Sequence, residues 1–221
     1  MTVKGREKGG AVPQGVVGRL PIYFRYLSEL EHQGIERISS AQLGKALDFT
    51  AAQIRSDLSY FGSFGQQGYG YNVQDLLKQV RLILGLNKNY SMILIGAGNL
   101  GKAIACYSGF KMQGFEINAI FDIDPHLVGN FLEGTTIQHV DKLEDYLKEN
   151  HVDVAILATP KNASQSMADL LGKSDVESIW NFSPAHLTVP DNVIVENIHL
   201  TDSLYGLVFR LNENREIRKQ G

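Results

Sequence analysis

The sequence predicts an α/β protein with two domains: a small helical N-terminal domain and a parallel sheet with helices on both faces. Three observations predict this fold class. Apolar residues recur at helical spacing over residues 19–61, apolar strand-like runs alternate with helical stretches after residue 90, and a glycine-rich segment directly follows the first of those strands. The chain has 221 residues, 43% of them hydrophobic and 20% charged, which is enough to bury two cores.

The composition excludes several classes of protein. The longest apolar runs, at residues 92–95 and 154–158, are far too short to cross a bilayer, and the first residues lack the pattern of a signal peptide. A single cysteine, Cys106, excludes an internal disulfide framework, and we expect it to be a small core residue. The six histidines lack metal-ligand spacing. We therefore expect a cytoplasmic protein without a metal site or a membrane partner.

The N-terminal part of the chain predicts a winged helix. Its predicted elements, in chain order, are helices over residues 19–34, 39–47 and 50–61, a glycine- and aromatic-rich hairpin over 60–73, and a helix over 73–84. Ser39 and Thr50 each precede a glutamine by three residues, which is the spacing of a capping box. Two short helices joined by a turn, followed by a hairpin, are typical of a module that binds DNA. Residues 1–17 are glycine-rich and predict a flexible arm, which leaves residues 18–85 for this domain.

The helix after Thr50 carries the side chains that we expect to contact DNA. Its apolar side contains Ile54, Leu58 and Phe61. The opposite side presents Ala52, Gln53, Arg55, Ser56 and Ser59. Glutamine can bond adenine, arginine can bond guanine, and small side chains let a helix enter the major groove. We also expect DNA contacts from the hairpin tip, Gln66-Gln67, and from Arg19 in the first helix. A solvated helix face is the alternative explanation for these polar residues.

Beyond a linker at residues 85–89, strands and helices alternate. Strands are predicted at residues 92–95, 115–121, 136–140, 154–158, 178–182 and 193–196, and helices at 99–110, 142–150 and 163–173. Buried strands that alternate with helices form a parallel sheet, which here occupies residues 90–200. A last amphipathic helix over residues 201–218 has one apolar face, made of Leu204, Leu207, Val208 and Leu211.

The segment Gly96-Ala97-Gly98-Asn99-Leu100-Gly101 is a G-x-G-x-x-G motif between a predicted strand and a predicted helix. Gly96 permits the tight turn, Gly98 lets a pyrophosphate approach the backbone, and Gly101 lets the helix pack closely on the strand. The free amides at the start of the helix suit the phosphates. The next strand ends in Asp122, whose carboxylate accepts from ribose hydroxyls and repels a 2′-phosphate. The motif therefore predicts a Rossmann-type domain that binds NAD(H) rather than NADP(H).

A small NAD-dependent reductase is the alternative function. Tyr107 and Lys111 form a Y-x-x-x-K pair, which short-chain dehydrogenases use for proton transfer. However, this pair lies on the first helix after the glycine loop, away from the carboxyl edge of the sheet where a nicotinamide would sit. Residues 90–200 also leave no room for a second, catalytic domain. We therefore predict no catalytic residues and no enzymatic activity.

Six segments together resemble the bacterial redox-sensing transcriptional repressor family Rex. They are GRLPIYFRYL (18–27), ISSAQLGKAL (38–47), TAAQIRSDLSYFGSFGQQGYGYNV (50–73), IGAGNLG (95–101), FDIDP (121–125) and NFSPAHLTVP (181–190). The resemblance covers nearly all of residues 17–211 and implies a homodimer that represses genes by binding palindromic operator DNA. It further implies that NADH releases the operator, that NAD⁺ competes with NADH, and that the C-terminal helix is swapped between subunits. A divergent paralogue that binds nucleotide without switching on DNA remains an alternative.

The resemblance also assigns residues. It implies that Ile123 accompanies Asp122 at the dinucleotide, and that Thr159 and Pro160 lie near the nicotinamide. It implies a switch between subunits made by Arg25, Tyr107 and the residue at position 199.

The sequence departs from the family pattern at three places. Ser56 stands where the family has a second basic residue, and Gln66-Gln67 stand where it has lysine or arginine. Since each missing cation removes a phosphate contact, these changes bear on DNA affinity. His199 stands where the family has the switching aspartate. Because a histidine cannot neutralise Arg25 as an aspartate does, this change bears on the redox response.

Overall fold

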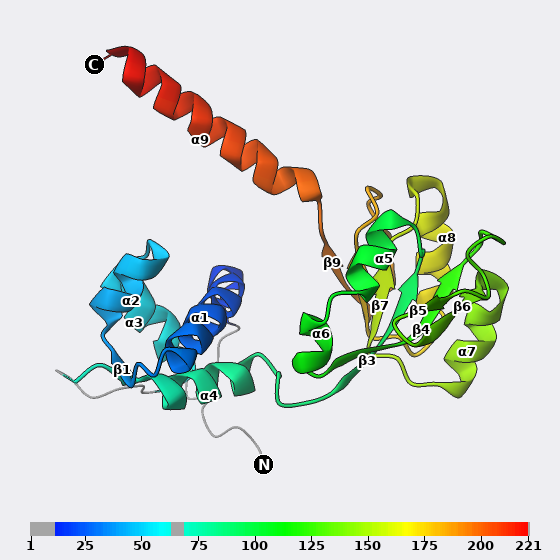
Figure 1. The fold of residues 1–221 in the computed structure, drawn as a ribbon, viewed down its shortest axis with the longest axis horizontal. Coiled ribbons are helices and arrows are strands. Elements are labelled where there is room, and N and C mark those ends of the chain that lie inside the picture. Colours follow the sequence, from blue (N-terminus) through cyan, green and yellow to red (C-terminus); the bar gives the residue numbers. More distant parts are fainter. Residues whose placement is uncertain (1–11, 63–68, 221) are drawn as a thin grey trace. The chain divides into compact units, whose positions relative to one another are not determined.

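The computed structural model describes residues 12–62 and 69–220 (Figure 1). The chain divides into two compact units that meet between Lys88 and Asn89, inside the predicted linker. Within the described residues, no helix is long and apolar enough to cross a membrane.

The described residues of the N-terminal unit form four helices and a small antiparallel pair of strands. The helices are α1 (Gln14–His32), α2 (Ser40–Leu47), α3 (Ala51–Ser59) and α4 (Val73–Ile83), and the strands are β1 (Arg37–Ile38) and β2 (Tyr71–Asn72). Their apolar sides share one core, in which Tyr23, Leu27, Leu43 and Ile54 are fully buried. A capping box sets the start of α2. The Ser39 hydroxyl and the Gln42 side chain cap each other's backbone amides, as predicted.

Two predictions for this unit need correction. The arm was expected to extend to residue 17, but α1 already begins at Gln14, because extended Pro13 precedes it and Val16 is buried. The sequence did not predict strand β1, which pairs antiparallel with β2. The tip of the predicted hairpin, including Gln66 and Gln67, lies outside the described residues.

The C-terminal unit is built on one sheet of seven strands in the order β5-β6-β4-β3-β7-β8-β9. The strands are β3 (Tyr90–Ile95), β4 (Phe115–Asp122), β5 (Phe131–Leu132), β6 (Thr135–His139), β7 (Val154–Leu157), β8 (Ser178–Asn181) and β9 (Ile194–Asn197). All neighbours pair in parallel except the short edge strand β5, which was not predicted. The strand order reverses on either side of β3, and this reversal point is where Rossmann-type sheets bind ligands.

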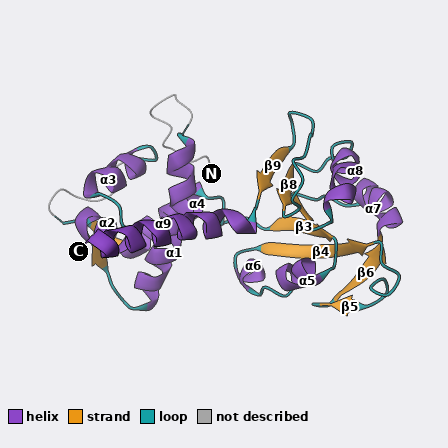
Figure 2. Ribbon diagram, turned by 90° about the horizontal axis from the view of Figure 1, so that it is seen from above, coloured by secondary structure: helices purple, strands orange, loops and turns teal. Residues whose placement is uncertain are grey.

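Helices cover both faces of this sheet, as Figure 2 shows. They are α5 (Asn99–Ala105) and α6 (Gly109–Met112) on one face, and α7 (Leu143–Glu149) and α8 (Lys161–Leu171) on the other. Because successive strand residues point to opposite faces, Ile93 and Ile95 pack in the core with α7 and α8, whereas Leu94 packs in the core with α5. The predicted doubly covered parallel sheet is confirmed.

The predicted single helix over residues 99–110 is wrong, because it breaks after Ala105. Tyr107 and Ser108 leave the helix, and α6 restarts at Gly109. A Cβ at Gly109 would lie 2.5 Å from the Tyr107 ring, so this bend depends on glycine. The break also overturns the expectation for Cys106, which caps α5 and is exposed rather than buried in a core.

The last helix, α9 (Leu200–Gln220), follows β9 directly. Its large apolar side chains are exposed, among them Leu204, Leu207, Val208 and Leu211 of the predicted apolar face. This helix therefore has no covering partner among the described residues of its own unit.

Candidate functional site

The outward side of α3 has the composition that the sequence predicted. Ile54 and Leu58 are buried, whereas the other side of the helix is exposed at Ala52, Arg55, Ser56 and Ser59. The Arg55 guanidinium reaches α2, where its Nη1 donates to the Ser40 hydroxyl at 3.1 Å. The side chains that face solvent are thus one cation, two hydroxyls and a methyl group. This set can enter a major groove and read a base edge.

A buried carboxylate, Asp57, holds α3 against α1. Its Oδ2 accepts from Arg19 Nε at 2.6 Å and from the Tyr23 hydroxyl at 2.5 Å, and its Oδ1 accepts from Arg19 Nη2 at 2.9 Å. Gln53 Nε2 also donates to Oδ1, at 2.8 Å. Asp57 is 1% exposed, so the four donors replace the water that the carboxylate loses.

Ionisation in this cluster is shifted in consistent directions. Burial alone disfavours the charged carboxylate, but the hydrogen bonds from Arg19, Tyr23 and Gln53 outweigh it and lower the pKa of Asp57 below its ordinary value. Burial and the hydrogen bond to Asp57 raise the pKa of Tyr23. The cluster is therefore an ion pair with a neutral tyrosine over the ordinary pH range.

The Asp57 cluster changes what can be expected of two predicted DNA contacts. The Arg19 guanidinium already forms an ion pair with Asp57, so a DNA phosphate would have to compete with a buried carboxylate for this guanidinium. Gln53 donates one amide hydrogen inward and keeps its second hydrogen and its carbonyl oxygen for a base. At the start of α3, the Thr50 hydroxyl accepts from the Gln53 backbone amide at 3.1 Å, so only this half of the predicted capping box is formed.

The glycine motif adopts the geometry that a dinucleotide loop requires. Gly96 has φ +98°, and a Cβ there would lie 2.6 Å from the Ala158 carbonyl oxygen. A Cβ on Gly101 would lie 1.9 Å from the Gly96 carbonyl oxygen, so only glycine allows this close packing. At Gly98, by contrast, a Cβ would have nothing within 4 Å. The first and last glycines are required by the fold, and the middle glycine leaves open space in front of the loop.

Asp122 lies beside this loop at the end of β4. Its Oδ2 accepts from the Ala97 amide at 2.5 Å, and its Oδ1 accepts from the Asp124 amide at 2.8 Å. Each carboxylate oxygen has a second lone pair, so the side chain can still accept from two hydroxyls. Asp122 thus accepts a hydrogen bond from the glycine loop and presents negative charge at the edge of the sheet.

A small apolar cavity of about 110 Å³ brings five of the predicted cofactor residues together, namely Gly96, Asp122, Ile123, Thr159 and Pro160. It is lined by Ile95, Gly96, Phe121, Asp122, Ile123, Val140, Thr159, Pro160, Ala163 and Met167. Thr159 and Pro160 were expected near the nicotinamide, but they share this cavity with Asp122, the residue predicted for the adenosine ribose. The reason is topological, since β7 is the direct neighbour of β3 and its carboxyl end lies beside Gly96.

Sequence reasoning missed Val140, Ala163 and Met167 as cavity residues. Val140 follows β6, and the other two lie in the first two turns of α8. Because all three follow the carboxyl ends of parallel strands, the predicted sheet already contained the signal that could have identified them.

The remaining predicted residues do not join either cluster. Arg25 is exposed on α1, and His199 is exposed between β9 and α9. Tyr107 is 61% exposed and packs edge-on against Phe110, with ring centroids 4.9 Å apart. Tyr107 and Lys111 line a different cavity, of about 490 Å³, that contains none of the glycine-loop residues.

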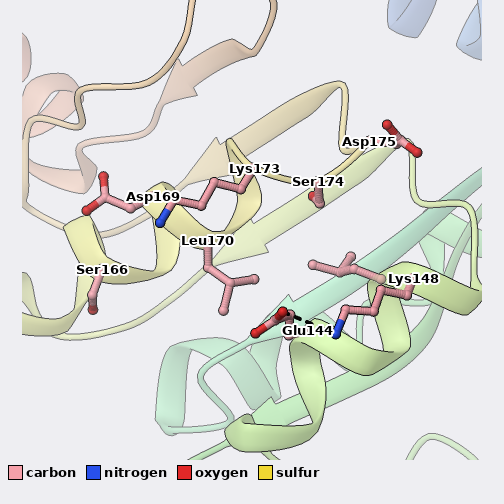
Figure 3. A pocket seen from close by; sticks show the side chains of 9 residues that line it. Glu144, Lys148, Ser166, Asp169, Leu170, Lys173, Ser174 and Asp175 are labelled. Atoms are coloured by element: carbon pink, nitrogen blue, oxygen red, sulfur yellow. Dashed lines mark ion pairs between the residues drawn. The ribbon is translucent and has the colours of Figure 1, made fainter.

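A further groove of about 640 Å³ lies between α7 and α8 (Figure 3). Its lining mixes charged side chains, among them Lys148, Asp169 and Lys173, with Leu147 and Leu170. Lys148 pairs with Glu144 at 3.1 Å. None of the predicted site residues is among the described residues that line it. In the same described part of the chain, no three potential metal ligands gather.

Two family models match the chain, one for each unit. The model described as the N-terminus of putative DNA-binding proteins matches residues 11–59, and the model described as a CoA binding domain matches residues 87–185.

Similar proteins of known name and structure cover almost the whole chain. The redox-sensing transcriptional repressor Rex of Caldanaerobacter subterraneus subsp. tengcongensis is 50% identical over 213 residues, which are 96% of this chain and 95% of the relative. Rex of Clostridium tetani is 49% identical over 95% of this chain and 100% of its own. A crystal structure of RSP in complex with β-NADH has a TM-score of 0.89 at 44% identity and covers 96% of this chain and 100% of its own. RSP in complex with β-NAD⁺ and operator DNA has a TM-score of 0.88 at 47% identity, with 96% and 97% covered. The chain therefore belongs to the Rex family of redox-sensing transcriptional repressors.

Proposed function

We propose that this protein is a homodimeric repressor that binds a palindromic operator through α3 and leaves it when NADH occupies the C-terminal unit. One observation carries the proposal: Gly96, Asp122 and Thr159 converge on one cavity, in a chain whose other unit presents an exposed helix-turn-helix face. The related RSP structures with β-NADH and with β-NAD⁺ and operator DNA support both ligands. The apolar face of α9 supports pairing of two chains.

The residues present fit a dinucleotide. The open space at Gly98 and the free start of α5 suit a pyrophosphate, Asp122 suits a ribose diol, and the apolar cavity beside Ile123 suits an adenine ring. When bound, the nicotinamide dinucleotide supplies the redox signal, because its two oxidation states differ in charge. The chain contributes binding and orientation.

An enzymatic role has less support. Tyr107 and Lys111 lie around a cavity that Gly96 and Asp122 do not share, so the Y-x-x-x-K pair lacks a place beside the predicted cofactor site. We infer that the protein senses the dinucleotide without turning it over.

The proposal is tested by measuring operator affinity with and without NADH. Fluorescence anisotropy with a labelled palindromic duplex should show tight binding with NAD⁺ or without nucleotide. Saturating NADH should weaken it by about 5- to 150-fold, the usual range of coupling between two sites. Operator affinity that is the same at all NADH concentrations would contradict the switch, and steady NADH oxidation with a substrate would instead favour the reductase.

Asp122→Ala is expected to weaken NADH binding by about tenfold or more, because two charge-assisted hydrogen bonds are lost. The preference for NADH over NADPH should narrow, since no charge remains to repel a 2′-phosphate. Titrations of NADH and NADPH fluorescence measure both. Asp122→Asn keeps an acceptor oxygen and should narrow the preference with a smaller loss of NADH affinity, whereas Asp175→Asn, an exposed change of the same charge, should alter neither. Equal affinity of the natural protein for NADH and NADPH would contradict this role of Asp122.

Arg55→Ala is expected to weaken operator binding by about 1–3 kcal/mol, because Arg55 is an exposed cation on the outward side of α3. The loss of affinity should depend on the base sequence. Arg55→Ala should weaken binding to the preferred operator more than binding to operators with altered bases. Lys45→Ala, an exposed change of the same charge on α2, should weaken all sequences by a similar factor. A uniform loss with Arg55→Ala would instead place Arg55 on a phosphate.

A further inference from the structure

A network of hydrogen bonds in the C-terminal unit runs from the predicted nucleotide cavity to the start of α9. Among the described residues, four polar or charged residues are buried, and three of them belong to this network: Ser164, Asn181 and Ser183. Burying such groups is unfavourable unless every donor and acceptor is paired. None of the buried side-chain polar atoms in the described residues lacks a partner.

The first part of the network begins at the cavity wall. Thr159 lines the cavity, and its hydroxyl lies 3.1 Å from the Ser164 hydroxyl in the first turn of α8. Ser164 donates to the Pro160 carbonyl oxygen at 2.8 Å and lies 2.5 Å from the Ser183 hydroxyl. Because Ser164 has one hydrogen and two lone pairs, these three bonds saturate it if Thr159 and Ser183 both donate to it.

The second part reaches the end of the sheet. Asn181 Oδ1 accepts from the Ser183 amide at 3.0 Å, and Asn181 Nδ2 donates to the Ala185 carbonyl at 3.0 Å and to Asn197 Oδ1 at 2.8 Å. The Asn181 carbonyl also accepts from the Ile198 amide at 2.8 Å. Asn197 is the last residue of β9, and α9 begins at Leu200. Asn181 therefore holds the junction of β9 and α9 by both its side chain and its backbone.

We infer that Ser164, Ser183 and Asn181 are positioning residues that transmit occupancy of the nucleotide cavity to the first turn of α9. This inference rests on the proposed function, since it takes NADH as the occupant. A ligand in the cavity contacts the wall that Thr159 forms, and it fixes or turns that hydroxyl. Because Thr159 and Ser183 together fill the two lone pairs of Ser164, a turned Thr159 leaves one of these lone pairs without its donor, and the change passes to Ser183 and the loop held by Asn181. The device thus links the ligand site to the helix that the proposal assigns to subunit pairing.

Hydrogen exchange measured by mass spectrometry tests the inference on the full chain. The readout is the peptide covering residues 197–204, with and without saturating NADH. In the natural protein we expect NADH to slow its exchange by about fivefold or more, the lower end of coupling between linked sites. In Ser164→Ala and in Asn197→Ala, NADH should still bind, as checked by its fluorescence, but the slowing should fall by more than half. Asn197 is exposed, so its replacement keeps the fold even if the buried change at Ser164 is destabilising.

Two matched controls separate the network from general effects. Ser166→Ala removes a hydroxyl from the same helix outside the network, and Asn192→Ala removes an exposed amide from the loop before β9. Both should keep the full effect of NADH. If NADH binds the natural protein and leaves residues 197–204 unchanged, or slows them equally in all variants, the inference is wrong while the proposed nucleotide site stands. If NADH does not bind the natural protein, both the proposed function and the inference are overturned.

Discussion

Asp57→Ala is expected to lower the free energy of unfolding of the N-terminal unit by about 3–5 kcal/mol, the range found when one partner of a buried ion pair is removed. The substitution leaves the donors of Arg19, Tyr23 and Gln53 without their acceptor, at a position where the Asp57 side chain is 1% exposed. Since a small domain is stabilised by only about 5–15 kcal/mol, much of the unit should unfold near 37 °C. Operator binding should be lost with it. Thermal and urea denaturation followed by circular dichroism measure the change.

Asp57→Asn removes the charge and keeps the size, and it should cost less than the alanine variant. Asp75→Asn, an exposed change of the same kind on α4, should leave stability within about 0.5 kcal/mol of the natural protein. If Asp57→Ala unfolds at the same urea concentration as Asp75→Asn, the cluster does not stabilise the unit.

The Asp57 cluster also predicts how the unit responds to pH. The pKa of Asp57 is lowered in the folded state, so its stabilisation is complete above the unfolded pKa of about 3.9 and is lost as the pH falls through the lower folded value. The pKa of Tyr23 is raised, so stability also falls as the pH rises above about 10, where the unfolded tyrosine ionises first. Asp57→Asn should show a shallower loss of stability in acid.

Gly98→Ala and Gly101→Ala are expected to weaken NADH binding strongly, for different reasons. At Gly98 the added methyl meets no atom of the protein and fills the space into which a pyrophosphate must come, so the fold should survive while NADH affinity falls more than about tenfold. At Gly101 the methyl would lie 1.9 Å from the Gly96 carbonyl oxygen, so α5 must move and the C-terminal unit should lose stability as well. Fluorescence titration and thermal denaturation of both variants separate the two effects.

Gly18→Ala is a suitable control for both variants, because Gly18 lies exposed inside α1 with open space around it. It should keep NADH affinity and gain up to about 1 kcal/mol of stability, since alanine favours helix more than glycine does. Normal NADH affinity in Gly98→Ala would show that the dinucleotide does not approach this loop, and would place it elsewhere.

Features that depend on local chemistry could be predicted from the sequence. The cap at Ser39 requires only a hydroxyl and a glutamine three residues apart, and the glycine loop requires only a strand, three glycines and a helix. Asp122 follows from the same logic, because it ends the strand beside the loop. Helix ends were less accurate, since the break at Tyr107 depends on how that ring packs against Phe110.

The two polar networks could not be predicted, because their partners are far apart in the sequence. Arg19 and Asp57 are 38 positions apart, and a charged residue on a helix is ordinarily assigned to its solvated side. One signal was present: Asp57 stands between Ile54 and Leu58 in the apolar stripe of α3, which is an unusual position for a charge unless a partner neutralises it. Asn181 and Ser183 likewise interrupt an apolar segment.

The uncovered apolar face of α9 makes the amount of protein matter to its activity. If only a partner chain covers this helix, the free energy of folding includes the free energy of pairing. The concentration of paired repressor then rises with the square of the chain concentration, as long as most chains are single. Unpaired chains present the same face to proteases and to one another, so they are removed or aggregate first. A modest fall in synthesis would therefore lower the concentration of paired repressor by a larger factor than synthesis itself falls. Repression would be relieved without any change in the concentrations of NADH and NAD⁺.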